Sequence, residues 1–218
     1  MMMAPEMFYT ERLQGKSVAE IKSVIRSLKR EMARLKNMME HPNYKSTMLP
    51  SEDTRLSMAR DYLERAKQAL VEAGGTYTPT KAEEKVATFD ESLQNISKIE
   101  FSLVSFGCGI EARTYTFDGE TVHVDVLHAL FSDPADWDDI TEWDRDELLS
   151  ELKELHIGEW RRRYDISRFG FLMLDGESWQ LTIHYRNAKR AVNIKGENSY
   201  PYNFGRLLEL FGVEMPDN

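Results

Sequence analysis

The sequence of 218 residues contains only one cysteine, Cys108, which lies between two glycines. A single cysteine excludes an internal disulfide bond and a zinc site built from several thiolates. No apolar run approaches the roughly 20 residues that a membrane-spanning helix needs. The first residues also lack the basic and apolar regions of a secretion signal. We therefore expect a cytoplasmic protein that makes no membrane contact.

The short motifs of the common enzyme classes are also missing. The sequence has no P-loop, no G-x-G-x-x-G, no G-x-S-x-G and no H-E-x-x-H. Its five histidines stand in no motif that would activate Cys108 as a nucleophile. We expect no catalytic residue, no metal and no cofactor. An alternative is a small-molecule enzyme of another class that uses Cys108 or His184.

Charge is distributed unevenly along the chain. Residues 1–76 hold 13 Lys/Arg and 10 Asp/Glu, a net charge of +3, within a total of −9. The remaining residues therefore carry −12. An acidic body of this kind argues against direct nucleic-acid binding and favours a basic partner.

Residues 17–75 carry the pattern of two helices that fold back on each other. Ser17 and Glu20 form a capping box at the start of the first helix, and Pro42 ends it. Ser51 caps the second helix, and Gly74 ends it. Apolar residues recur at three-four spacing in both helices, which predicts an antiparallel, coiled-coil-like hairpin. The seam consists of Val18, Ile21, Ile25, Leu28, Met32, Leu35 and Met39 in the first helix and Leu56, Ala59, Leu63, Ala66, Leu70 and Ala73 in the second.

The two edges of this predicted seam differ in character. One edge, here called the basic edge, consists of Lys22, Lys29, Lys36, Arg60 and Lys67. The other, the apolar edge, consists of Val24, Met38, Tyr62 and Ala69. Like charges that face each other along one edge repel, so the basic edge is either solvated or faces an acid, which is the protein's own acidic segment or a nucleic-acid backbone. The apolar edge is expected to dock on the body or to bind a partner or a second copy.

The rest of the chain predicts a sheet with helices. Residues 76–96 are polar and predict a connector with one helical turn. Strand-like alternation covers residues 99–106, 111–117 and 121–126, with a hairpin turn at Asp118-Gly119. A helix is expected over residues 145–156, a second group of strands over 169–174, 179–185 and 191–194, and a short helix between Pro201 and Gly212. The sequence thus predicts an α+β fold with a helical hairpin (1–75), a connector (76–96) and an antiparallel sheet domain with covering helices (97–218).

An acidic stretch precedes the expected helix. Residues 133–147 contain eight acids and two tryptophans and partly match a calcium-binding loop. Ile140 and Thr141 stand where that loop needs a ligand and a glycine, so we expect no metal there. The carboxylates can cap the following helix, or they can imitate a phosphate backbone and bind a basic groove. The candidate binding residues are Asp136, Trp137, Asp138, Asp139 and Trp143.

A resemblance comes from residues 174–185, LDGESWQLTIHY, and residues 195–201, KGENSYP. This run resembles a small domain of uncharacterised accessory proteins of Gram-positive gut bacteria and their mobile elements. The resemblance covers about fifty residues. It implies a bacterial, mobile-element context and assigns no activity or site residue.

Three functions follow from these features. The first is a non-enzymatic protein that binds a protein partner, or a second copy, through the hairpin and the acidic body. The second is an inhibitor encoded by a mobile element, similar in action to an anti-CRISPR protein, whose acids mimic nucleic acid against a basic nucleic-acid-binding protein. The third is the small-molecule enzyme.

Overall fold

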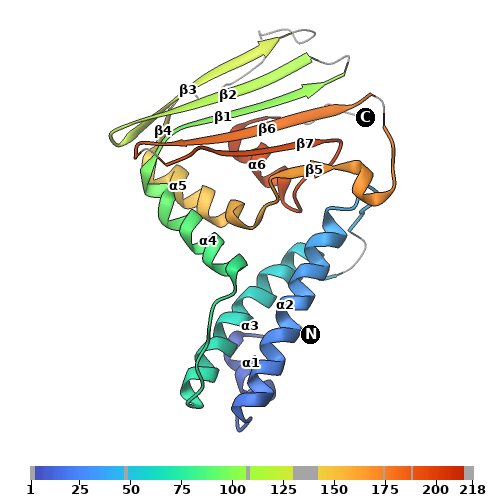
Figure 1. Cartoon of the computed structure of the whole chain (residues 1–218), viewed down its shortest axis with the longest axis vertical. Helices are drawn as coiled ribbons and strands as arrows, with labels where there is room; N and C mark the ends of the chain where they lie inside the picture. Colours follow the sequence, from blue (N-terminus) through green and yellow to red (C-terminus); the bar gives the residue numbers. More distant parts are fainter. Residues whose placement is uncertain are drawn as a thin grey trace. The chain divides into compact units, whose positions relative to one another are not determined.

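The computed structural model describes residues 3–46, 49–106, 109–129, 142–173, 175–187 and 189–213. The chain divides into two compact units, Met1–Pro79 and Thr80–Asn218 (Figure 1). The division falls inside the segment 76–96, which the sequence predicted to be a connector. Each unit has its own set of buried side chains.

The first unit is built around the helices α2 (Val18–Met39) and α3 (Glu52–Glu72), which pack against each other. Both sides of the predicted capping box are present, since the Ser17 hydroxyl accepts from Glu20 N and the Glu20 carboxylate accepts from Ser17 N. The Ser51 hydroxyl caps α3, and Gly74 follows it with a φ of +77°. Most seam positions are buried. Alanine at every second position of α3 brings its backbone close to the larger side chains of α2.

A third helix, α1 (Pro5–Arg12), packs against α3 and was absent from the sequence prediction. Proline at its first position suits a helix start. Its buried residue is Phe8, and Leu13, which follows it, is 1% exposed. One turn of apolar spacing is too short to stand out as a periodic pattern, which is why the sequence did not reveal this helix.

The second unit contains one seven-stranded sheet in the order β4-β3-β2-β1-β6-β7-β5. The strands are β1 (Ile96–Ser105), β2 (Gly109–Asp118), β3 (Thr121–Ala129), β4 (Glu142–Asp144), β5 (Arg163–Asp165), β6 (Glu177–Tyr185) and β7 (Val192–Glu197). The α+β class is confirmed, but a purely antiparallel sheet was wrong, because β5 pairs with β7 in parallel. Three-residue strands at both edges give too little sequence for a strand pattern.

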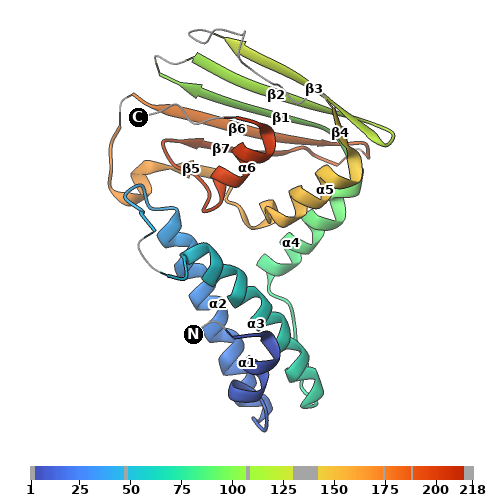
Figure 2. The ribbon, with the colours of Figure 1, turned by 180° about the vertical axis from the view of Figure 1, so that it is seen from behind.

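Helices cover one face of this sheet (Figures 1 and 2). They are α4 (Lys81–Ser92), α5 (Arg145–Glu154) and α6 (Phe204–Phe211). α4 occupies the segment expected to be a connector, and it contributes Phe89 to the core. Aromatic rings join α6 to the strands, since Phe211 lies 4.6 Å from Tyr115 and Phe204 lies 4.7 Å from Trp179, measured between ring centroids. The single apolar face of each element fixes this two-layer arrangement.

Residues 169–173 do not form the strand that was expected over residues 169–174. The short 3-10 helix η4 (Ile166–Phe169) ends there at Gly170, which has a φ of +79°. The next residues are exposed instead of buried, with Phe171 40%, Leu172 88% and Met173 55% accessible. Apolar composition predicted a buried strand, but no second layer of the fold covers this segment among the described residues.

We predict that Gly196→Ala strongly destabilises the second unit. A Cβ atom at Gly196 would lie 2.2 Å from Trp179 Nε1 and 2.4 Å from Ser199 O, which are hydrogen-bonded to each other at 3.0 Å. Overpacking of this kind costs about 1–3 kcal/mol. Urea unfolding measures the loss. Gly205→Ala is the matched control, since nothing lies within 4 Å of that Cβ and alanine favours the helix. Equal stability of the two variants would contradict the packing argument.

Candidate interaction surfaces

The basic edge of the hairpin is partly covered by the chain that leaves α3. Lys29 and Lys67 each place the ammonium nitrogen 5.0 Å from the centroid of the Tyr77 ring. Lys67 also contacts Glu64 at 2.7 Å. An aromatic face attracts cations, so Tyr77 reduces the repulsion between these two lysines. Of the other members, Lys22 is exposed, whereas Lys36 and Arg60 are half-buried.

The apolar edge is covered in part by α1. The Tyr62 ring stacks on Phe8 with the centroids 4.3 Å apart, and its hydroxyl donates to Met3 O at 2.8 Å. Ala69 is buried, and Val24 and Met38 are half-buried. The same edge carries an ion pair between the helices, from Arg55 Nη2 to Glu31 Oε1 at 2.8 Å. The first unit therefore supplies its own cover for a surface that the sequence assigned to the body or to a partner.

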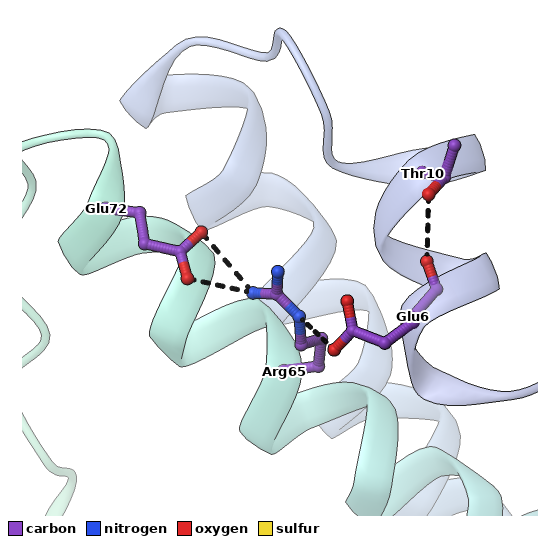
Figure 3. Close-up of polar contacts among 4 residues, drawn as sticks. All are labelled: Glu6, Thr10, Arg65 and Glu72. Carbon is purple, nitrogen blue, oxygen red and sulfur yellow. Dashed lines mark hydrogen bonds and ion pairs between the residues drawn. The ribbon is translucent and has the colours of Figure 1, made fainter.

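Arg65 joins α1 to α3 (Figure 3). Its Nε donates to Glu6 Oε1 at 3.0 Å, and its Nη1 lies 3.3 Å from Glu72 Oε1. The guanidinium carbon also lies 3.7 Å from the centroid of the Tyr9 ring. Only 11% of the Arg65 side chain is exposed. No sequence pattern singles out Arg65, because its partners lie up to 59 positions away along the chain.

Most of the acidic stretch lies outside the described residues. Asp136, Trp137, Asp138 and Asp139 are among those that the structure does not describe, as is Cys108. The fifth candidate, Trp143, belongs to β4, and its indole packs against the core. A binding role for the acidic stretch stays a prediction.

The sheet face opposite the helices is mainly polar. Its outward positions include Ser102, Thr114 and Gln180, and they hold no Phe, Tyr or Trp among the described strand residues. Binding of single-stranded nucleic acid on a sheet depends on aromatic side chains that stack on bases. The composition of this face therefore does not favour that function.

A small charged cluster lies near the middle of the polar face. Glu100 contacts Lys98, and its second oxygen lies 2.7 Å from His184 Nε2. The hydrogen bond from Lys98, followed by the one from His184, lowers the pKa of Glu100. His184, a candidate of the alternative enzyme, is thus paired across β1 and β6. These pairs hold neighbouring strands in register.

A second polar cluster is buried on the helix-covered face. Arg113 is 2% exposed and donates from Nη2 to Gly212 O at 3.1 Å. Its Nη1 lies 3.1 Å from Glu111 Oε2, which also lies 2.6 Å from His128 Nδ1. Gly212 follows α6, where carbonyl groups lack helical partners and cations are favoured. This cluster attaches the end of α6 to β2.

The exposed large apolar side chains of the second unit gather at one end of the sheet. This group, here called the apolar end, consists of Val104, Phe106, Ile110, Leu127, Phe171, Leu172 and Met173. Val104 lies opposite Ile110, and Leu127 lies opposite Ala112 on the same face. Phe106 N donates to Gly176 O, which brings the segment 171–173 to this end. Among the described residues of the second unit, every exposed large hydrophobic side chain belongs to this group.

A hollow of about 430 Å³ adjoins the apolar end. Its lining includes the apolar residues Ile166, Phe171, Leu172 and Met173 and the acidic residues Asp165, Asp175, Glu177 and Glu197. A hydrogen bond from the Ser167 hydroxyl, supported by its backbone N–H, lowers the pKa of Asp165. The hollow thus combines apolar surface with negative charge. The described residues contain no cluster of His, Cys, Asp or Glu suited to a metal.

We predict that Arg65→Ala loosens α1. Loss of the contacts to Glu6, Glu72 and the Tyr9 ring should raise hydrogen exchange in residues 5–12 by about tenfold, because a desolvated cation–ring contact with ion pairs contributes roughly 1–2 kcal/mol. Arg26→Ala is the control, since Arg26 is exposed on α2. Equal exchange in the two variants would contradict the assignment.

We predict that Glu100 makes a small, pH-dependent contribution to the free energy of unfolding. Because its pKa in the folded protein is lowered, its stabilising effect is present above the unfolded value of about 4.3 and is lost as the pH falls through the folded value. Glu100→Gln should therefore reduce stability at pH 7 and flatten its decline in acid, by less than about 1 kcal/mol, since the pair is partly exposed. Urea unfolding of both proteins at pH 7 and in acid tests this prediction. Glu154→Gln, at an exposed position, is the control.

Within the described residues, no helix is long and apolar enough to cross a membrane. No family model matches the sequence, and no solved structure matches it. The chain is similar to the phenylalanine–tRNA ligase alpha subunit of Sulfolobus acidocaldarius, with 28% identity over 169 residues. The match covers 77% of this chain and 36% of that subunit, so the chain spans about a third of its relative's length.

Proposed function

We propose that this chain is a non-enzymatic protein-interaction protein whose partner binds the apolar end of the second unit. The observation that supports the proposal is the grouping of exposed apolar side chains at one end of the sheet. Soluble monomers rarely leave large contiguous apolar patches exposed, and such patches mark protein contacts. Phenylalanine and methionine are also enriched in the centres of interfaces.

The hairpin belongs to the same proposal as a second contact surface. Lys22 is exposed, and Val24 and Met38 are half-buried on the opposite edge. Tyr62, Lys29 and Lys67 already contact other parts of the first unit. A partner of the hairpin would therefore use its remaining surface, whether or not that partner also binds the apolar end.

The ligase relative does not extend this proposal to catalysis. Ligase activity belongs to the protein that carries that name, and this chain corresponds to about a third of its length. The polar sheet face offers no aromatic platform for RNA among its described residues. The inhibitor hypothesis depends on Asp136, Asp138 and Asp139, which lie outside the described residues.

Site-specific photo-crosslinking tests the proposal. A benzophenone amino acid at Phe106, which is 72% exposed, should give one discrete adduct in an extract of the source cells. The same probe at Asp118, at the opposite end of β2, should give none. An adduct with twice the mass of the chain would identify self-association through this surface.

The dependence on apolar contact is tested in the same assay. Leu127→Ser and Leu172→Ser should reduce the Phe106 adduct at least fivefold, since each removes roughly 1 kcal/mol or more of apolar burial at the contact. Both residues are exposed, so the fold should persist. Adducts of equal yield from Phe106 and Asp118, or yields unaffected by either serine, would contradict the proposal.

A further inference from the structure

The hollow beside the apolar end has two walls of different chemistry. The apolar wall is formed by Phe171, Leu172 and Met173, which follow η4. The acidic residues of the lining, here called the acidic wall, are Asp165, Asp175, Glu177 at the start of β6 and Glu197 at the end of β7. A volume of about 430 Å³ falls in the range of binding pockets, and it accommodates a few side chains of a peptide.

The acidic wall is held in place by backbone hydrogen bonds. Asn198, which has a φ of +49°, accepts from Glu177 N through Oδ1 at 2.7 Å and donates from its own N to Glu177 O at 2.9 Å. Gly176 lies so close that a Cβ would come within 1.9 Å of Asn198 Oδ1. The Glu177 carboxylate accepts a hydrogen bond from the Tyr200 hydroxyl. These bonds fix the backbone of Glu177 against the end of β7, so this part of the hollow is held in place before a ligand binds.

The charges of the hollow are only partly compensated. Arg163 contacts Asp165 at 3.3 Å and Glu197 at 3.5 Å, and it is itself 56% exposed. Arg168, also nearby in sequence, lies over the Phe169 ring. Even with Arg163 and Arg168 both counted, the four acidic residues of the lining leave a net charge of −2. This polarity repels phosphates and attracts Lys and Arg side chains.

We infer that the hollow binds a polypeptide segment in which Lys or Arg stands beside a large apolar residue. The inference rests on the proposed interaction at the apolar end and names the chemical class of the partner. A cation alone would leave Leu172 and Met173 exposed, and an apolar segment alone would bury carboxylates without counter-charge, which is costly. Only a segment with both chemistries matches both walls.

Binding of short synthetic peptides to the full chain tests this inference. The probe is an acetylated, amidated peptide of alternating Lys and Leu, and its comparisons replace Lys by Glu or Leu by Ser. In ¹⁵N NMR spectra, the Lys-Leu peptide should shift the amides of residues 163–178 and 197–198 and few others. Equal affinity of the Glu-Leu peptide, or shifts centred elsewhere, would overturn the inference.

Matched variants separate local charge from net charge. Asp175→Lys should weaken the Lys-Leu peptide about tenfold, whereas Asp118→Lys makes the same charge change at the other end of β2 and should leave affinity within twofold. Leu172→Ser should weaken binding about fivefold, and Leu49→Ser, at a side chain that is 99% exposed in the first unit, should not. Equal effects of the two aspartate changes would overturn the local site.

The crosslinking assay distinguishes this inference from the proposed function. If Leu172→Ser abolishes the Phe106 adduct and Asp175→Lys does not, the apolar end binds a partner that is not basic, and only the inference fails. If neither substitution affects the adduct, both fail. Loss of the adduct with each substitution supports both.

Discussion

Burial of one sheet face by three helices is the constraint on which the second unit depends. Phe101, Tyr115 and Trp179 all point to that face, and α6 packs on them with Phe204 and Phe211. Because α4, α5 and α6 supply a single layer, the opposite face is free to be polar. The surfaces available for function are therefore the polar face and the ends of the strands.

The first unit must also bury an apolar surface, and it does so with fewer elements. Two helices bury one seam, but they leave two edges, and the chain covers part of each with its own segments. Phe8 stacks on Tyr62 at one edge, and Tyr77 lies near Lys29 and Lys67 at the other. These covers explain how a hairpin with four lysines and one arginine along one edge remains compatible with a stable fold.

Much of this fold follows from local sequence patterns. Ser17 with Glu20, Gly74, Asp118-Gly119 and Gly212 marked the ends of elements, because caps and turns depend on a few neighbouring residues. The sequence patterns did not predict the short edge strands or the helices α1 and α4. The stability of these elements comes from partners that are distant in the sequence, such as Lys195 for Arg163 and Tyr62 for Phe8. The apolar end was missed for another reason. Residues 169–174 have the composition of a buried strand, and only the tertiary structure shows that Phe171, Leu172 and Met173 are exposed.

The hollow is encoded by two sets of residues that do not overlap. Its frame depends on Gly176, Asn198 and Tyr200, which hold β6 and β7 together, whereas its chemistry depends on exposed residues such as Leu172 and Asp175. Substitutions of exposed residues usually change stability by little. A lineage of such proteins can therefore exchange one binding partner for another by surface substitution while the scaffold stays intact.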